Sequence, residues 1–110
     1  MRTVISIIIP SYNSSLTIIP TLRSLEEQSL NNFEVVVVNN GSSDDTNTKI
    51  QSFNSGSDLV IKLIEMPKLT RGKARNVGVN NSVGDLLIFY DSDVRINPES
   101  VKYHYEFHEN

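Results

Sequence analysis

Two aspartates separated by one residue, Asp91 and Asp93, directly follow the apolar segment 86–90. A run of that length and composition predicts a buried β-strand. In open parallel α/β sheets ligands bind outside the carboxyl ends of the strands, so both carboxylates can reach one hard cation there. A Mg²⁺ or Mn²⁺ ion is usually held by one or two carboxylates, while substrate phosphates and water complete its shell. The pair therefore indicates a divalent metal that holds a phosphate-bearing substrate; a solvated acidic turn is the alternative.

A basic cluster supplies the complementary charge. Arg71, Lys73 and Arg75 lie at the predicted N-terminus of a helix, where free backbone amides and the helix dipole already favour anions. Arg71 and Arg75 are four residues apart and therefore share one face of that helix. A diphosphate between this cluster and the acidic pair would account for both, whereas a solvated basic helix is the alternative.

The first predicted strand, residues 4–9, ends in the polar cluster 10–13. Tyr12 offers a flat ring on which a nucleobase can stack, and backbone groups around Pro10 can meet the edge of the base. Packing of the tyrosine ring against a neighbouring side chain is the alternative.

The second predicted strand, residues 33–38, ends in the cluster 39–42. Asn40 presents both a donor and an acceptor, which suits the edge of a base or a ribose hydroxyl. Asn-Gly is also a common turn pair, so turn formation is the alternative. The residues that we assign to capping of the next helix are Gly41, Ser42 and Asp44.

Apolar strands alternate with helical patterns along the chain. The predicted strands span residues 4–9, 33–38, 59–64 and 85–90. The predicted helices run from Ser14 or Ser15 to about Gln28, up to about Phe53, over residues 71–83, and from Asn97-Pro98 toward His108. We expect Pro10 to end the first strand and Pro20 to lie near the first turns of its helix.

This order predicts an α/β fold, with a Rossmann-like, mostly parallel sheet and helices on both of its faces. Parallel strands bring their carboxyl ends to one edge of the sheet. The clusters that follow the first, second and fourth strands should therefore lie together, and we expect them to form one site.

Composition limits the class of protein. The 110 residues correspond to one domain over residues 1–110, and their net charge of −3 argues against a general nucleic-acid binder. The chain has no cysteine, which fits a reducing compartment. Its apolar runs are of strand length, short of the roughly 20 residues that a membrane span needs, and residues 1–3 open no secretory signal. We expect a cytoplasmic module, with peripheral attachment to a membrane left open.

As a set, four motifs resemble those of family 2 glycosyltransferases of the GT-A fold, in family order and spacing. They comprise residues 6–13 with 22–28, residues 33–44, residues 74–78 and residues 84–93. In that family the tyrosine of the first motif flanks the base, the acidic pair before Gly-Ser contacts base and ribose, and the last aspartate of the DxD motif binds the divalent ion.

The resemblance implies a nucleotide site and a metal site at matching positions of this chain. The nucleotide-binding residues would be Pro10, Tyr12, Asn13, Asn39, Asn40, Arg71, Lys73, Arg75, Asp91 and Ser92. The ligands of a Mn²⁺ or Mg²⁺ cofactor would be Asp91 and Asp93. Two departures matter. The family commonly has aspartate at the positions of Asn39 and Asn40, and often carries a further aspartate where this chain has Val94.

The implied function is that of the donor half of a glycosyltransferase. Such a chain binds a nucleotide-diphospho-sugar with a metal ion, for transfer of the sugar by inversion to a hydroxyl of a saccharide or lipid-linked acceptor. In the family the acceptor-binding elements and the catalytic base lie well downstream of DxD, so we expect no catalytic base within these residues and little activity from them alone.

Two other functions stay open. One is a non-catalytic remnant that binds nucleotide or associates with itself as a homo-oligomer. The other is a sugar nucleotidyltransferase, which we rank last because those enzymes have a Gly-rich loop after the first strand, and residues 10–13 do not form one.

Overall fold

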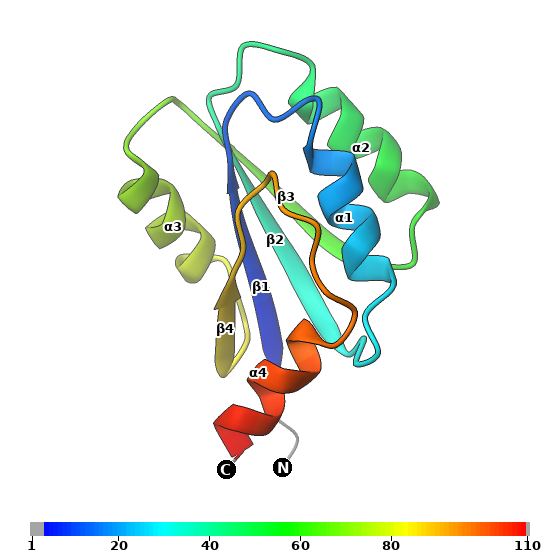
Figure 1. Ribbon diagram of the computed structural model, residues 1–110. Helices are drawn as coiled ribbons and strands as arrows, with labels where there is room; N and C mark the ends of the chain where they lie inside the picture. Colours follow the sequence, from blue (N-terminus) through cyan, green and yellow to red (C-terminus); the bar gives the residue numbers. More distant parts are fainter. Residues whose placement is uncertain (1–3, 110) are drawn as a thin grey trace.

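The computed structural model describes residues 4–109, in which strands and helices alternate (Figure 1). The strands are β1 (Ile5–Ser11), β2 (Phe33–Asn40), β3 (Val60–Met66) and β4 (Leu86–Phe89). The helices are α1 (Ile18–Glu26), α2 (Thr46–Gly56), α3 (Arg71–Asn80) and α4 (Ser100–Glu109). The sheet order is β3-β2-β1-β4 and every pair of neighbours is parallel, which confirms the predicted α/β fold.

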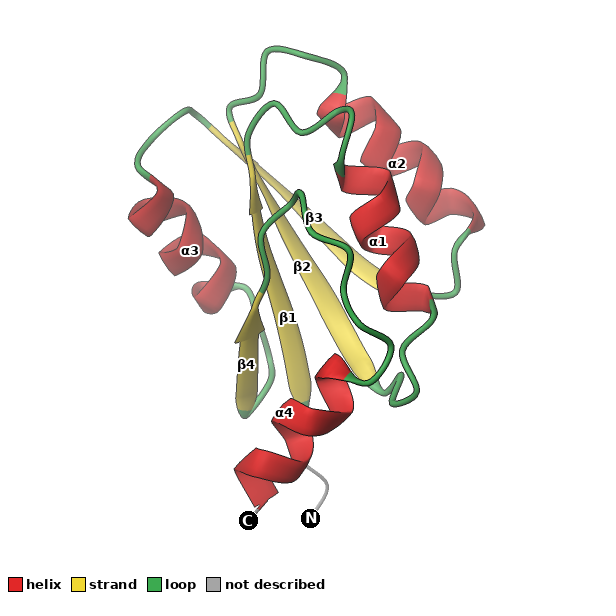
Figure 2. Cartoon of the chain, in the orientation of Figure 1, coloured by secondary structure: helices red, strands yellow, loops and turns green. Residues whose placement is uncertain are grey.

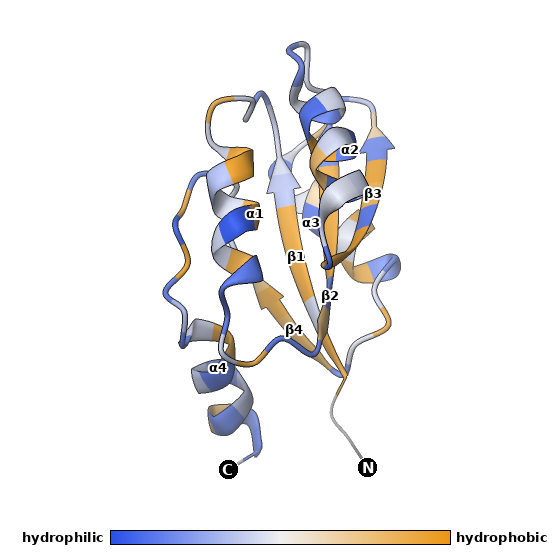
Figure 3. Cartoon of the chain, turned by 90° about the vertical axis from the view of Figure 1, so that its right-hand side faces the viewer, coloured by the Kyte–Doolittle hydropathy of each residue, from blue (hydrophilic) through white to orange (hydrophobic). Residues whose placement is uncertain are grey.

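Helices cover both faces of this sheet (Figure 2): α1 and α2 lie on one face and α3 on the other. Side chains alternate along each strand, so Val35 and Val37 pack under α1 and α2 while Val36 and Val38 pack under α3. All four valines are fully buried, since an unbroken apolar run suits a strand that is covered on both faces. Figure 3 shows β1 and β2 as mostly hydrophobic, whereas hydrophobic and hydrophilic residues alternate along the helices.

Helix α3 approaches the sheet closely because a glycine faces it. A Cβ atom on Gly78 would lie 2.5 Å from Cγ2 of Ile8, closer than such atoms pack, and Ala74 is fully buried one turn earlier. Small residues on this face therefore allow the helix to lie close to the sheet. The close packing fixes the basic N-terminus of α3 beside the carboxyl end of β1.

The prediction that Pro10 ends the first strand is wrong. Strand β1 continues to Ser11, with Pro10 opposite Val38 of β2. On its other side β1 pairs with β4 only from Ile5 to Ile8. Pro10 therefore has a strand neighbour on one side only, as edge positions do, and its missing N–H group is tolerated.

The predicted starts of two helices are also wrong. Helix α1 begins at Ile18 rather than near Ser15, because the carbonyl of Ser14 accepts hydrogen bonds from the N–H groups of Thr17 and Ile18 in a preceding turn. Pro20 is the third residue of the helix, as expected of a proline in a first turn. Helix α4 begins at Ser100, because the carbonyl of Asn97 accepts the Ser100 N–H in another turn.

In residues 4–109 no helix has the length and apolar character required to cross a membrane.

Candidate functional site

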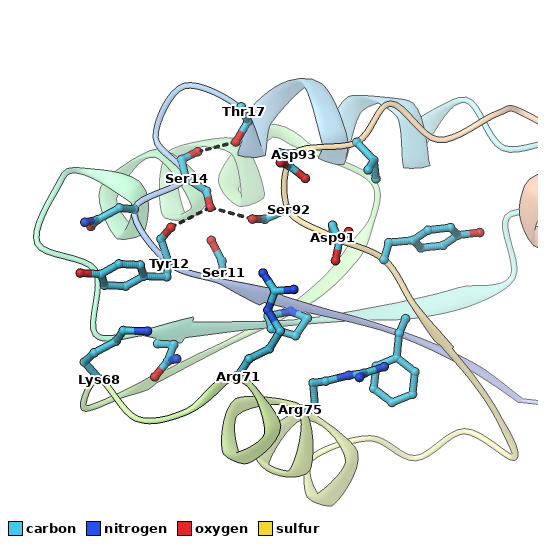
Figure 4. Close-up of a pocket in the computed structure, with 16 residues that line it drawn as sticks. Ser11, Tyr12, Ser14, Thr17, Lys68, Arg71, Arg75, Asp91, Ser92 and Asp93 are labelled. Atoms are coloured by element: carbon cyan, nitrogen blue, oxygen red, sulfur yellow. Dashed lines mark hydrogen bonds between the residues drawn. The ribbon is translucent and has the colours of Figure 1, made fainter.

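A cavity of about 680 Å³ opens at the carboxyl edge of the sheet (Figure 4). It lies between the ends of β1, β2 and β4, beside the N-terminus of α3. The residues that line it are Pro10, Ser11, Tyr12, Asn13, Ser14, Thr17, Asn40, Lys68, Arg71, Arg75, Phe89, Tyr90, Asp91, Ser92, Asp93 and Val94. Parallel strand direction therefore brings the three polar clusters together, as the sequence predicted.

Every predicted site residue lines this cavity except Asn39 and Lys73. Asn39 is 5% exposed, and its side-chain oxygen accepts a hydrogen bond from the Ser42 hydroxyl. Lys73 is exposed on α3, two residues from both Arg71 and Arg75. Residues two apart on a helix point in different directions, so Lys73 cannot share the face of the two arginines.

Asn40 lines the cavity, but its carboxamide is occupied by the backbone of Leu69. Its Nδ2 donates to the Leu69 carbonyl at 3.0 Å, and its Oδ1 accepts from the Leu69 N–H at 2.9 Å. Gly41 follows with a φ of 68°, and a side chain there would collide with the backbone of Lys68. The Asn-Gly pair therefore holds the loop between β3 and α3 against the end of β2.

That loop places Lys68 over the ring of Tyr12, with the lysine Nζ 4.0 Å from the ring centroid. The sequence reasoning missed Lys68, because it considered the ends of the first, second and fourth strands and not that of the third. The sequence did contain a reason to consider Lys68, because this residue follows the third predicted strand of the same parallel sheet. Its ammonium group donates hydrogen bonds and accepts none.

The cavity has a basic wall and an acidic wall. Figure 4 shows Arg71 rising from α3 toward Asp91, while the Arg75 guanidinium lies 4.5 Å from the centroid of the Phe89 ring. Within residues 4–109 the ion pairs join Lys62 to Glu34 and His108 to Glu109. Since neither pair belongs to the cavity, both of its walls keep their charge for a ligand.

The acidic wall offers oxygen ligands to a hard cation. Asp91 and Asp93 are exposed in the cavity, and among the described residues neither carboxylate has a hydrogen-bond partner. Over residues 4–109 no group of three or more histidine, cysteine or acidic side chains is arranged to hold a metal. Two carboxylates fit Mg²⁺ or Mn²⁺, provided that a bound phosphate and water complete the shell.

The loops after β1 and β2 are joined by Asn13, a residue with a φ of 48°. Its Oδ1 accepts from the Ser43 N–H at 2.8 Å, and its own N–H donates to the Ser42 hydroxyl at 2.9 Å.

In the loop after β2, Asp44 accepts the Thr46 N–H at the start of α2, but the N-cap residue of this helix is Asp45, whose side chain makes no capping hydrogen bond. The prediction that Gly41, Ser42 and Asp44 cap the helix is therefore wrong for Ser42, whose hydroxyl donates to Asn39 instead, and holds for Asp44 only as a bond from just before the cap. The hydroxyl of Thr46 also donates to Asp44 and holds the pKa of that carboxyl below its usual value.

Ser11 is a further residue that sequence reasoning left without a role. Its side chain is 2% exposed and lines the cavity, yet its hydroxyl has no hydrogen-bond partner in the described part of the chain. A buried hydroxyl without a partner costs about 1–3 kcal/mol. Nothing in the sequence indicated a role for Ser11. Attention went to its neighbours Pro10 and Tyr12, whose side chains suggested contacts with a base.

Known proteins share this architecture. A family model described as "Glycosyl transferase family 2" matches residues 6–110. An uncharacterized glycosyltransferase of Bacillus subtilis, YfnE, is 41% identical over 108 residues, which cover 96% of this chain and 27% of that protein.

Two solved structures extend the comparison to the fold. The crystal structure of Staphylococcus aureus TarS 1-349 in complex with UDP-GlcNAc matches with a TM-score of 0.85 and 34% identity, over 96% of this chain and 31% of that one. The mannosyltransferase PcManGT from Pyrobaculum calidifontis, in complex with GDP-Man and Mn²⁺, matches with a TM-score of 0.78 and 27% identity, over 84% of this chain and 28% of that one. The chain thus spans about a third or less of these relatives.

The match over nearly the whole chain, and the likeness in fold to glycosyltransferases of the GT-A type, agree with the motifs and with the cavity. This chain belongs to glycosyl transferase family 2.

Proposed function

We propose that this chain binds the nucleoside diphosphate of an activated sugar together with a divalent ion, as the donor half of a glycosyltransferase. One observation carries the proposal: a single cavity is lined by an aromatic ring that follows β1, two arginines from α3 and two carboxylates that follow β4. A base, a diphosphate and a metal ion need these three kinds of group side by side.

The base would lie beside Tyr12 and Lys68. The ring supplies a stacking surface, and the lysine ammonium can donate to a ring carbonyl. Uracil and guanine both carry such carbonyls, and the relatives' structures hold UDP-GlcNAc in one case and GDP-Man in the other. We favour UDP because the TarS structure is the more similar of the two.

The diphosphate would lie at the N-terminus of α3. Thr70 caps this helix by accepting the Lys73 N–H at 3.2 Å, and α3 has no acidic residue in its first turn. The helix dipole and the Arg71 guanidinium then act on an anion in the same direction. Arg75, one turn further on the same face, adds a second positive charge.

Asp91 and Asp93 would hold the divalent ion, with Ser92 beside them. A bound ion there would neutralise charge that develops on the leaving diphosphate. In the transfer, the bond between the anomeric carbon and the diphosphate oxygen breaks with its electron pair leaving on that oxygen. The acceptor oxygen forms the new bond to that carbon with inversion, and its proton passes to a carboxylate base.

Neither aspartate of the acidic wall would serve as that base, since both would contact the ion. We propose that the base and the site for a saccharide or lipid-linked acceptor belong to the part of such enzymes that this chain does not span. Residues 1–110 would form one domain of the whole. A cytoplasmic location agrees with the absence of cysteine from the sequence.

Calorimetric titration with UDP and with GDP, each in Mn²⁺, Mg²⁺ or EDTA, tests the proposal. We expect heat of binding with at least one nucleotide in the presence of a metal ion, and much weaker binding in EDTA. Absence of binding to both nucleotides under all three conditions would contradict it. A suitable control is Asp58→Ala, which removes an exposed carboxylate in the loop before β3, away from the cavity.

One observation favours the alternative of a self-associating remnant. Tyr103 and Phe107 lie four residues apart on α4, and they are 65% and 87% exposed. Two large rings on one helix face could pack against a second copy of the chain. Analytical ultracentrifugation distinguishes the two functions: self-association without nucleotide binding supports the remnant, whereas a monomer that binds nucleotide supports the donor half.

A further inference from the structure

The inner side of α1 and its C-terminal extension carries a buried stripe of polar residues. Thr21, Ser24 and Gln28 follow one another at intervals of three and four residues, and they are 1%, 5% and 5% exposed. Positions with this spacing lie on one side of a helix. Burial of a polar side chain is unfavourable unless it is hydrogen-bonded, so the contacts of this stripe call for an explanation.

The stripe faces the chain that follows β4. Strand β4 ends at Phe89 and α4 begins at Ser100, and Figure 1 shows the connecting segment alongside α1. Residues 92–99 have no strand neighbour. Their backbone groups need other partners, and side chains of the stripe provide several of them.

Thr21 contacts the backbone on both sides of Asp93. Its Oγ1 lies 2.7 Å from the carbonyl oxygen of Val94 and 3.2 Å from that of Ser92. The hydroxyl has one proton, so it donates mainly to the nearer Val94 carbonyl. Beside it, the hydroxyls of Ser14 and Ser92 share a hydrogen bond of 2.7 Å. The peptide groups around Asp93 are therefore fixed to the start of α1.

The two other members of the stripe hold the rest of the segment. The Ile96 N–H donates to the Ser24 hydroxyl at 3.0 Å. The side chain of Gln28 donates to the Asn97 carbonyl at 2.8 Å and accepts the Val101 N–H at 3.1 Å. Thr21 thus acts next to the acidic wall, whereas Gln28 acts at the start of α4.

We propose that Thr21 is a positioning residue for Asp93, and that the polar stripe of α1 sets the geometry of the acidic wall. This inference rests on the proposed function, because it concerns the site assigned there to the divalent ion. A metal site requires its ligands to be held to within about half an ångström. Asp91 and Asp93 lie outside regular secondary structure, and neither carboxylate has a partner of its own in the described chain, so the backbone must be held instead.

Thr21→Val tests the inference, because valine keeps the shape of threonine and removes the hydroxyl. Two quantities are measured: amide hydrogen exchange at Ile96, whose N–H donates to the Ser24 hydroxyl at the far end of the segment that Thr21 holds, and the Kd of UDP in Mn²⁺ and in EDTA. We expect exchange at this amide to become about tenfold faster, because loosening of the segment by the loss of one ordinary hydrogen bond makes its opening easier by about that factor. We expect the Kd in Mn²⁺ to rise by a similar factor while the Kd in EDTA changes less than about twofold.

Three further variants complete the design. Thr21→Ser keeps the hydroxyl and should restore both quantities. Gln28→Leu should lower stability and speed exchange near Val101 without changing the ratio of the two Kd values. Thr48→Val, at an exposed position of α2, is the matched control and should change nothing. If Thr21→Val does not fold, Ser14→Ala removes the neighbouring bond to Ser92 and should shift both quantities in the same direction.

Wild-type exchange at the Ile96 amide in a folded Thr21→Val protein would overturn the inference, whatever the nucleotide results. An equal rise of Kd in Mn²⁺ and in EDTA would also overturn it, since it would show general damage to the cavity. Failure of the unsubstituted protein to bind UDP and GDP is a different result. It would contradict the proposed function and remove the metal ion from the inference, while hydrogen exchange would still decide whether Thr21 orders the segment.

Discussion

Two strand ends at the same edge of the sheet carry similar polar residues, but these residues differ in burial and in hydrogen bonding. At the end of β2, Asn39 and Asn40 are 5% and 3% exposed, and side-chain atoms of both bond to neighbouring loops. At the end of β4, Asp91 and Asp93 are exposed in the cavity, with no hydrogen-bond partner for either carboxylate among residues 4–109. The β2 end builds the wall of the cavity, and the β4 end presents groups to a ligand.

The difference shows what makes a polar residue at a strand end available for binding. Position at the carboxyl edge is shared by all four residues, so position alone does not decide. What decides is whether the fold already provides partners for the side chain. A carboxamide can satisfy a backbone donor and a backbone acceptor at once, as Asn40 does with Leu69, whereas an ionised carboxylate can only accept.

Asp93→Ala should have the largest effect on nucleotide binding, and it tests the residues that follow β4. We expect metal-dependent nucleotide binding to weaken by about 100-fold or more, because even the outer partners of a metal ligand are worth about 10–100-fold. The thermal unfolding midpoint should stay close to that of the unsubstituted protein, since the carboxylate is exposed. Titration calorimetry in Mn²⁺ and thermal unfolding provide the two measurements, and unchanged affinity would remove Asp93 from the metal site.

Asn40→Ala should give the opposite pattern at the β2 end. The change removes both hydrogen bonds to Leu69 and should lower the free energy of unfolding by about 2 kcal/mol. Asn40→Asp keeps the acceptor but loses the donor, and it places a negative charge beside the Leu69 carbonyl. Urea unfolding measures both variants. If the alanine variant kept full stability and lost nucleotide binding, Asn40 would contact the base as the sequence suggested.

Much of the fold, and the position of several cavity residues, could be predicted from the sequence because these features depend on local patterns. Apolar runs predicted the strands, and strand–helix alternation predicted the parallel sheet that brings Tyr12, Asn40 and Asp93 to one cavity. The spacing of Arg71 and Arg75 likewise predicted a shared helix face. These features need no knowledge of distant partners.

What the sequence did not predict depends on contacts between distant residues. The partner of Asn40 is the backbone of Leu69, 29 residues away, and the position of Lys68 follows from that contact. The passage of β1 through Pro10 depends on where β4 ends. The role of Thr21 depends on a segment more than 70 residues later. No periodicity or motif encodes such pairings.

Arg71→Ala tests the basic wall opposite the β4 end. Loss of one guanidinium that contacts a phosphate should weaken nucleotide binding by about tenfold, in line with a charge-assisted hydrogen bond. The effect should shrink at high salt, because screening already weakens such a contact between exposed charges. Lys73→Ala is the matched control on the same helix, since Lys73 lies outside the cavity. Equal losses in the two variants would mean that the whole helix surface, rather than one face, attracts the nucleotide.

Glu34 extends the comparison to the amino end of β2, where a carboxylate has partners of its own. Its Oε2 accepts the Ser6 hydroxyl at 2.6 Å and the Val83 N–H at 2.8 Å, and Lys62 lies 3.3 Å from Oε1. Partial burial alone would raise the pKa of Glu34, but these hydrogen bonds and the lysine charge outweigh it and hold the pKa below its ordinary value.

A lowered folded-state pKa means that ionised Glu34 stabilises the fold above its unfolded pKa, and that this stabilisation disappears as pH falls through the folded value. Solvent screening keeps the contribution below about 1 kcal/mol, the smallest effect predicted here. Urea unfolding of Glu34→Gln between about pH 3 and pH 7 should show a flatter dependence on acid pH than the unsubstituted protein. Thr48→Val, the exposed control on α2, should leave that dependence unchanged because it alters no ionisable group. A pH dependence of Glu34→Gln equal to that of the unsubstituted protein would mean that the hydrogen bonds of Glu34 do not stabilise its ionised form in the fold.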